Sequence, residues 1–336
     1  MPGPAPSVNK MQSTLSSRAP FHLEATVRVL QRRPGNRVDV WDRDRYLRVL
    51  PAGEKRVLVE VHNRGTIDAP DLQLAVRSGN PTASRLPALK RMLRQILGLD
   101  VDPRPFQRLA EAEPVLRSTA RALRGMRPPR FVNLFEAFAR VVPFQQMSLE
   151  AGVAITGRLV ERFGERIEYD NRSFHAFPTA SRIAHARSIS LRACGLSARK
   201  AETLRDLARA IESGELNEER VVGMRTPDAL QLLSGIPGIG PWSAALVLLR
   251  GLGRLDVFPP GDVGATRGLS ALLQVEPGTA LSRAIERFGN LRGYLYFYSL
   301  GESLLKRGLI HTALKSGEAT QVQSRTGRLR TISGRK

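Results

Sequence analysis

The sequence holds very little cysteine and no long apolar run. Cys194 is its only cysteine, which excludes an intramolecular disulfide, a cysteine-based zinc site and a four-cysteine iron–sulfur cluster. The longest purely aliphatic stretch, about residues 244–249, is far too short to span a bilayer. No apolar segment typical of a signal peptide stands near the first residue. We therefore expect a cytoplasmic protein in a reducing compartment, without a membrane partner.

Acidic residues are also scarce relative to basic ones. The chain has 52 Lys and Arg against 31 Asp and Glu, which gives a formal net charge of +21. Only seven of the basic residues are lysine, a bias that genomic base composition can also produce. A positive excess of this size favours a polyanionic partner, with nucleic acid first and a membrane surface second.

The two ends of the chain differ in composition from the middle. Residues 1–20 are rich in Pro and Ser, with no acid before Glu24, and predict a flexible tail. Residues 315–336 carry several basic side chains and no acid after Glu318. We expect them to form a basic disordered tail, which either adds non-specific DNA affinity or is simply a solvated end.

The segment between the tails changes its periodicity once. Apolar residues alternate at 24–30, 38–41, 46–50, 56–61 and 72–76, separated by Gly, Pro and Asn turn signals. Such short spacing predicts an antiparallel sheet, followed by a helix from near Arg85 to about Leu97. Residues 21–103 are thus expected to form an antiparallel β/α domain and residues 104–314 an all-α domain with two lobes. The predicted fold class is α+β.

Residues 232–244 contain the most informative motif, Leu-Leu-Ser-Gly-Ile-Pro-Gly-Ile-Gly-Pro-Trp-Ser-Ala. We expect one helix to end near Leu233 and another to begin at about Pro241. Gly238 and Gly240 permit a tight turn and a close approach of another backbone, and Ile239 can tuck between the helices. Amides at the start of the second helix then form an anion site. This pattern predicts a helix-hairpin-helix element that holds a DNA phosphate; a plain glycine turn is the alternative.

Asp262 follows the hairpin by 22 residues and comes directly after a Pro-Pro-Gly break. Its simplest role is a helix N-cap. A short return loop could instead bring its carboxylate to the DNA-facing end, where it would stabilise an oxocarbenium-like sugar and orient water. A base that alkylation has made cationic leaves without a general acid. Trp242 would offer such a base a π-face, or it packs in the core.

These motifs resemble the helix-hairpin-helix/Gly-Pro-Asp superfamily of DNA glycosylases, and within it the bacterial DNA-3-methyladenine glycosylase II family. The resemblance extends over about residues 21–310. It rests on the segments 98–103, 144–148, 177–179, 195–197 with 200–202, 237–244, 256–262 and 292–294.

The resemblance implies a role for several residues of this chain. Asp262 is the implied catalytic residue. Trp242 stands where lyase-active members have a Schiff-base lysine, which implies base excision without strand cleavage. The implied base pocket contains Trp242 and Tyr294, although Leu246 and Leu300 replace aromatic residues expected there. The implied DNA contacts are Gly238, Ile239, Gly240 and the wedge residues Gln145 and Gln146.

We therefore expect a monofunctional DNA glycosylase of base excision repair that flips alkylated, 3-methyladenine-type bases out of duplex DNA. It would act as a monomer associated with the nucleoid, without a cofactor or catalytic metal; a monovalent cation could bind to hairpin carbonyls. Two alternatives stay open. One is a glycosylase for oxidised or deaminated bases, and the other is a non-catalytic, damage-sensing DNA-binding protein.

Overall fold

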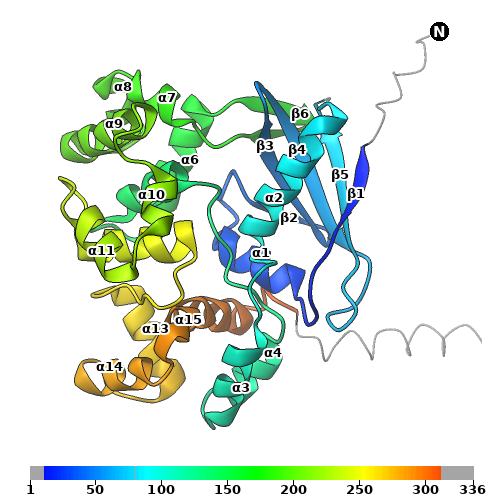
Figure 1. Ribbon diagram of the computed structural model, residues 1–336, viewed down its shortest axis with the longest axis vertical. Coiled ribbons are helices and arrows are strands. Elements are labelled where there is room, and N and C mark those ends of the chain that lie inside the picture. Colours follow the sequence, from blue (N-terminus) through cyan, green and yellow to red (C-terminus); the bar gives the residue numbers. More distant parts are fainter. Residues whose placement is uncertain (1–10, 80, 312–336) are drawn as a thin grey trace, which may run out of the picture.

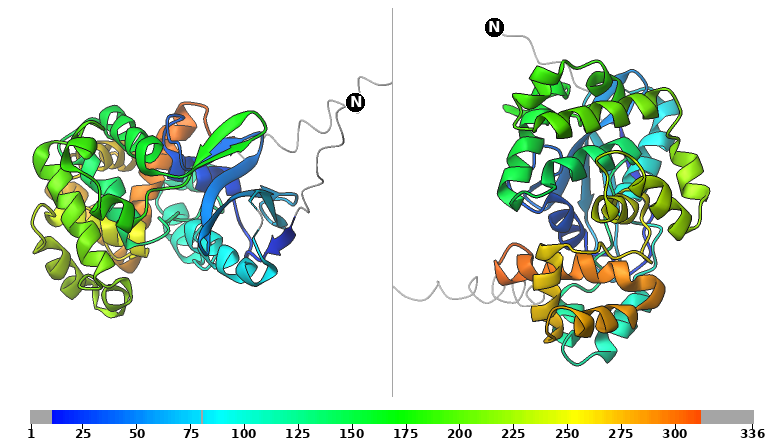
Figure 2. Two further views of the ribbon diagram at one scale, coloured as in Figure 1. Left: turned by 90° about the horizontal axis from the view of Figure 1, so that it is seen from above. Right: turned by 90° about the vertical axis from the view of Figure 1, so that its left-hand side faces the viewer.

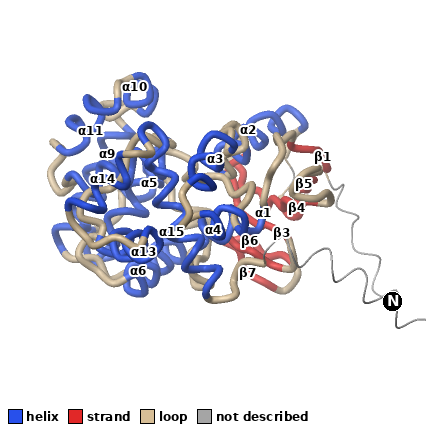
Figure 3. Tube along the Cα trace, turned by 90° about the horizontal axis from the view of Figure 1, so that it is seen from below, coloured by secondary structure: helices blue, strands red, loops and turns tan. Residues whose placement is uncertain are grey.

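A computed structural model describes residues 11–79 and 81–311 of the chain. Its strands gather on one side and most of its helices on the other (Figure 1, Figure 3), which confirms the predicted α+β class. The basic segment predicted as a tail, 315–336, lies outside the described residues. None of the helices within the described ranges combines the length and the hydrophobicity that crossing a bilayer requires.

The N-terminal domain contains a five-stranded antiparallel sheet in the order β1-β5-β4-β3-β2. Four of its strands confirm the sequence prediction: β2 (Val40–Asp42), β3 (Arg45–Ala52), β4 (Lys55–Asn63) and β5 (Leu72–Ser78). The fifth, β1 (Gln12–Leu15), falls in the predicted flexible tail and pairs with β5. The tail prediction is wrong for these residues, because a polar segment becomes ordered by completing a sheet edge.

The strand predicted at residues 24–30 is wrong, since this segment forms helix α1 (Leu23–Gln31). Helix α1 contacts both β2 and the last helix, α15 (Arg292–Lys306), and residues on nearly all of its sides are buried. Glu24 and Arg28 lie four residues apart, form an ion pair at 3.7 Å and give the helix a narrow polar stripe. The helical period was therefore present in the sequence beside the alternation that predicted a strand. The alternation of Ala25, Val27 and Val29 is incidental.

Both faces of the sheet are covered. On one face, alternate residues of β3, β4 and β5 pack with α1 and α2 (Leu86–Ile96) in the main core. On the other face, Leu47, Val49 and Leu58 pack against Phe174 and Ala176. Phe174 belongs to a hairpin formed by β6 (Arg166–Tyr169) and β7 (Arg172–His175), which the sequence did not predict. This hairpin lies within the helical part of the chain and attaches it to the sheet.

The helices form two lobes (Figure 2). The first contains α5 (Leu134–Val141), α6 (Leu149–Phe163), α7 (Ala180–Ala184), α8 (Ser188–Arg192), α9 (Ala198–Glu212), α10 (Glu218–Gly223), α11 (Thr226–Ser234) and α12 (Pro241–Val247). The second contains α3 (Arg104–Ala112), α4 (Arg117–Ala122), α13 (Val263–Leu273), α14 (Thr279–Glu286) and α15. Phe106 stacks on Tyr294 at 4.4 Å between ring centroids, and Thr119 Oγ1 donates to Glu302 at 2.7 Å. These contacts join α3 and α4 to α15.

A buried network of ions links the sheet domain to α5. Arg48 on β3 donates to Asp39 at 2.6 Å and to Glu136 at 2.6 Å, while Arg140 pairs with the same two carboxylates at 2.8 and 2.9 Å. The Tyr46 hydroxyl donates to Asp39 at 2.8 Å. Burial opposes ionisation of Asp39, but Arg140 and Arg48 hold its pKa well below the usual value. Two cations and two anions thus balance where the domains meet.

Candidate active site

Helices α11 and α12 form the predicted hairpin, with a turn of residues 235–240 between them. Ile239 is only 2% exposed and joins the core between the helices, as predicted. Gly238 has a φ of +85°, and a Cβ there would clash with the Thr203 hydroxyl. Gly240 has a φ of −86° and open space where a Cβ would lie. Gly238 is therefore required by the fold, whereas Gly240 keeps the outer face of the turn clear.

An open groove runs along this turn. Its walls come from the hairpin, the loop after α5 and the start of α9, and they include Arg199 and Lys200. Asp262 and Trp242 line the same groove. The structure thus brings together the glycine turn, the acid and the tryptophan that the sequence separates by up to 24 residues.

The two glutamines predicted as the wedge differ in their contacts. Gln145 Nε2 donates to Gly238 O at 2.8 Å and to Ser243 Oγ at 2.9 Å, so its amide holds the hairpin in place. Gln146 is exposed, has a φ of +52°, and precedes Met147, which is 45% exposed. The structure thus engages Gln145 in the hairpin and leaves Gln146 exposed, and the wedge role of the two glutamines stays a prediction.

Asp262 is the N-cap of α13 and also faces the opening. Its Oδ1 accepts a hydrogen bond from Ala265 N at 2.8 Å, and its Oδ2 accepts one from Trp242 Nε1 at 3.0 Å. The capping interaction that competed with the functional interpretation is therefore present, yet it does not remove the carboxylate from the site. Instead, the cap and the indole fix the orientation of both oxygens.

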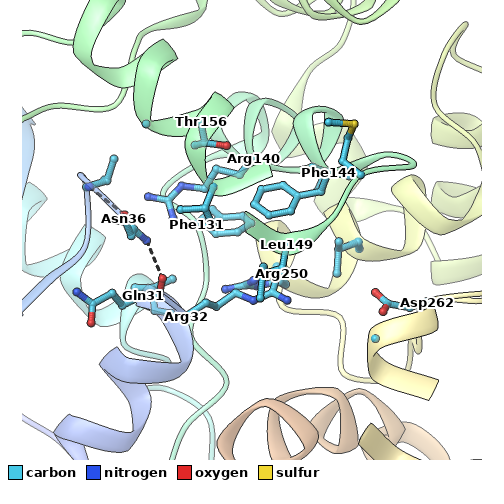
Figure 4. Close-up of a pocket in the computed structure, with 18 of the residues that line it drawn as sticks. Gln31, Arg32, Asn36, Phe131, Arg140, Phe144, Leu149, Thr156, Arg250 and Asp262 are labelled. Carbon is cyan, nitrogen blue, oxygen red and sulfur yellow. Dashed lines mark hydrogen bonds between the residues drawn. The ribbon is translucent and has the colours of Figure 1, made fainter. Parts of the chain in front are cut away.

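Asp262 and Trp242 also line a cavity of about 310 Å³ that adjoins the groove. Figure 4 shows Asp262 among the residues that line this cavity. A volume of this size suits a small planar ligand. Its wall includes residues 30–32 at the end of α1 and residues 36–38 in the loop that follows, together with Phe131, Phe144 and Tyr296. Four of the lining side chains are basic: Arg32, Arg37, Arg140 and Arg250. Asp262 is the one carboxylate among the described residues that line the cavity.

The predicted pocket role of Tyr294 is wrong. Its ring stacks on Phe106 and does not reach the cavity wall, and burial raises its pKa well above the usual value. Tyr296 lines the cavity instead. Of the two leucines at expected aromatic positions, Leu246 lines the cavity and Leu300 packs against the core.

Sequence reasoning named none of the arginines of the cavity wall. Arg250 could have been found, since Trp242, Leu246 and Arg250 follow one another at four-residue intervals. This spacing places them on one face of a helix, and α12 continues into the π-turn η3 (Leu248–Leu252). Nothing in the sequence of α1 and the loop after it indicates that these residues line the cavity, because their position depends on how the sheet domain packs.

Two family models match this chain. The AlkA N-terminal domain covers residues 12–133, and the HhH-GPD superfamily base excision DNA repair protein covers residues 139–289. A DNA-3-methyladenine glycosylase of Bacillus subtilis is 32% identical over 228 residues, which are 67% of this chain and 74% of that protein. The chain belongs to the HhH-GPD superfamily of base excision DNA repair proteins.

Other members of the superfamily agree with this assignment. The DNA-3-methyladenine glycosylase 2 of Escherichia coli is 35% identical over 138 residues, 41% of this chain and 48% of that protein. A solved structure of a 3-methyladenine DNA glycosylase from Archaeoglobus fulgidus has a TM-score of 0.71 and 28% identity. That match covers 88% of this chain and 98% of the other, so the sheet domain and both helical lobes share one architecture.

Proposed function

We propose that this protein is a monofunctional DNA glycosylase that hydrolyses the N-glycosidic bond of alkylated bases. One observation carries the proposal: the Asp262 carboxylate lies where the groove along the hairpin meets the inner cavity. The names of the relatives, which are DNA-3-methyladenine glycosylases, support the same reaction and substrate class.

In the proposed reaction, backbone amides of the hairpin turn hold a phosphate and the damaged nucleotide rotates into the cavity. The C1′–N bond then breaks, and its electron pair passes to the base. Asp262 stabilises the positive charge that develops on the sugar and accepts a proton from the water that adds to C1′. An alkylated base that starts as a cation leaves as a neutral molecule, and therefore needs no proton donor.

The contacts of Lys200 support hydrolysis over strand cleavage. Its ammonium donates to Gln145 O at 2.6 Å and to Pro143 O at 3.4 Å, so the lysine in the groove is engaged in structure. Desolvation lowers its pKa, but an amine tied to two carbonyls is not placed to form a Schiff base. Trp242 occupies the position where a lyase would need its own lysine.

A panel of duplexes tests this proposal. Each duplex contains one methylated, deaminated or oxidised base, and mass spectrometry measures the base that wild-type protein releases. We expect release of methylated bases without strand cleavage until alkali is added. Release of oxidised or deaminated bases alone would favour the alternative glycosylase. Binding to every duplex without release of any base would favour a damage-sensing protein.

The two hairpin glycines should respond differently to alanine. Gly240→Ala adds a methyl group in open space and should leave the melting temperature unchanged, but it should weaken DNA binding by about tenfold, because the methyl group keeps the phosphate away from the amides. Gly238→Ala places a Cβ against Thr203 at a positive φ and should destabilise the fold by about 1–3 kcal/mol. Calorimetry would measure the stability of each variant, and fluorescence anisotropy its affinity for DNA. Equal changes in both variants would contradict the separate roles of the two glycines.

The proposed substrate is double-stranded DNA with a damaged base, bound by a monomer at the nucleoid. No cofactor takes part in the proposed reaction. Among residues 11–79 and 81–311, no group of three or more His, Cys, Asp or Glu could hold a metal. The carbonyls of Ile236 and Gly238 accept hydrogen bonds from Ile239 N and Gln145 Nε2. A monovalent cation at the hairpin would therefore have to share these oxygens with the two hydrogen-bond donors. The binding of such a cation is a proposal.

A further inference from the structure

Arg250 is a buried cation in the cavity wall with unsatisfied hydrogen-bond donors. Only 3% of the residue is exposed, and its Nε and Nη2 have no hydrogen-bond partner among the residues that the structure describes. The guanidinium lies over the ring of Phe131, with 4.7 Å between its carbon and the ring centroid, and Phe131 N donates to Arg250 O at 2.7 Å. This packing holds the side chain in one place while its donors stay unused.

The other arginines of the cavity wall differ from Arg250. Arg32 also has an Nε without a hydrogen-bond partner, but its side chain is only partly buried. Arg37 forms an ion pair with Glu161 at 3.0 Å. Arg140 also lines the cavity, but Asp39 and Glu136 neutralise it. Arg250 forms no ion pair within the described ranges, and burial lowers its pKa to about 10, which keeps it charged at neutral pH. An unsatisfied buried donor is costly to the folded protein. When the unpaired donors belong to a charged guanidinium in the wall of a binding cavity, they point to a ligand that supplies the missing acceptor.

The ligand must also suit the rest of the cavity. Asp262 stands apart from Arg250 in the close-up view (Figure 4), and Asp262 is the group proposed to act on the sugar. The edge of the base that meets Arg250 then lies away from the glycosidic bond. In purines that edge carries the exocyclic group on the six-membered ring. Guanine has a carbonyl oxygen there, which accepts hydrogen bonds, whereas adenine has an amino group, which donates them.

We propose that Arg250 is a specificity-determining residue that donates hydrogen bonds to the exocyclic carbonyl oxygen of the extruded base, so that the cavity favours alkylated guanine over alkylated adenine. This inference rests on the proposed glycosylase function. An amino group at the same position would face the guanidinium donor to donor and leave both unpaired. Arg250 also stabilises the electron pair that the base gains as the C1′–N bond breaks, so its effect falls on the rate of release more than on binding.

Duplex DNA treated with dimethyl sulfate provides a sharp test, because it carries 7-methylguanine and 3-methyladenine in the same molecules. Mass spectrometry of one reaction then measures the release of both bases. We expect Arg250→Met to lower the rate of 7-methylguanine release by about 10- to 100-fold and that of 3-methyladenine by less than about threefold. Arg250→Lys, which keeps the charge but loses the planar fork, should fall between wild type and Arg250→Met.

Controls separate a specific effect from a general one. Arg187→Met removes one exposed charge outside the cavity and the groove, and should leave both rates unchanged. Partial unfolding lowers both rates alike, so the ratio of the two rates remains informative even for a less stable variant. A ratio in Arg250→Met equal to that of wild type would overturn the role of Arg250 and leave the proposed function intact. Wild-type protein that releases neither base would overturn both.

Discussion

Asp262→Asn should lower the single-turnover rate of base release by about 10²- to 10⁴-fold while leaving the affinity for duplex DNA within about threefold of wild type. The carboxylate supplies the negative charge that the developing cationic sugar needs and the base that takes the proton of water. Asparagine supplies neither. DNA affinity should persist, because the proposed phosphate contacts come from the hairpin backbone and the groove.

The fold should tolerate this substitution. Asparagine is as good an N-cap as aspartate, so the hydrogen bond from Ala265 N can remain and α13 can begin at the same residue. The bond from Trp242 Nε1 is lost, since one amide oxygen replaces two carboxylate oxygens. Asp256→Asn is a matched control, because Asp256 lies on the same loop but lines neither the groove nor the cavity. Rapid release by Asp262→Asn, or an equal loss in both variants, would contradict the catalytic role.

Arg48→Met should destabilise the protein by about 3–5 kcal/mol at pH 7. The substitution leaves Asp39 and Glu136 buried with only Arg140 to neutralise them, and removing one partner from a buried ion network has a cost of this order. Urea unfolding would measure the change. Arg124→Met, which breaks a surface ion pair with Asp68, should cost much less. Equal losses in the two variants would show that the buried network adds no more stability than the surface ion pair, which would contradict this prediction.

The same network gives stability a predictable dependence on pH. Because the pKa of Asp39 is lower in the folded than in the unfolded protein, its ionisation stabilises the fold above the unfolded pKa of about 3.9. That contribution is lost as the pH falls below this value toward the folded pKa. Wild-type protein should therefore lose stability steeply below about pH 4. Arg48→Met should lose less over the same interval, because Asp39 has one cation fewer beside it.

The parts of the site that could be predicted from sequence are those built from contiguous residues. The hairpin turn was predictable because each of its positions has its own physical requirement: a positive φ at Gly238, a buried contact at Ile239 and a helix start at Pro241. The acid was predictable because Asp262 follows a helix break at a fixed distance from that turn.

The remaining parts depend on how distant segments pack. Tyr294 and Tyr296 are two residues apart on α15 and therefore point to nearly opposite sides of the helix. Only one of them could line a cavity, and the sequence does not show which side faces it. The segment after α1 contributes to the cavity only because the ion network of Asp39 and Arg140 holds the sheet domain against α5. Long-range contacts of this kind leave no periodicity in the sequence.

The account depends most on the carboxylate of Asp262 facing the sugar of an extruded nucleotide. The most direct test compares the affinities of wild-type protein for two duplexes, one with a cationic pyrrolidine at the abasic position and one with a neutral tetrahydrofuran. We predict that wild type binds the pyrrolidine duplex at least about tenfold more tightly and that Asp262→Asn loses this preference. Equal affinity of wild type for both duplexes would contradict the account, because a carboxylate within reach of C1′ must distinguish a cation from a neutral ring.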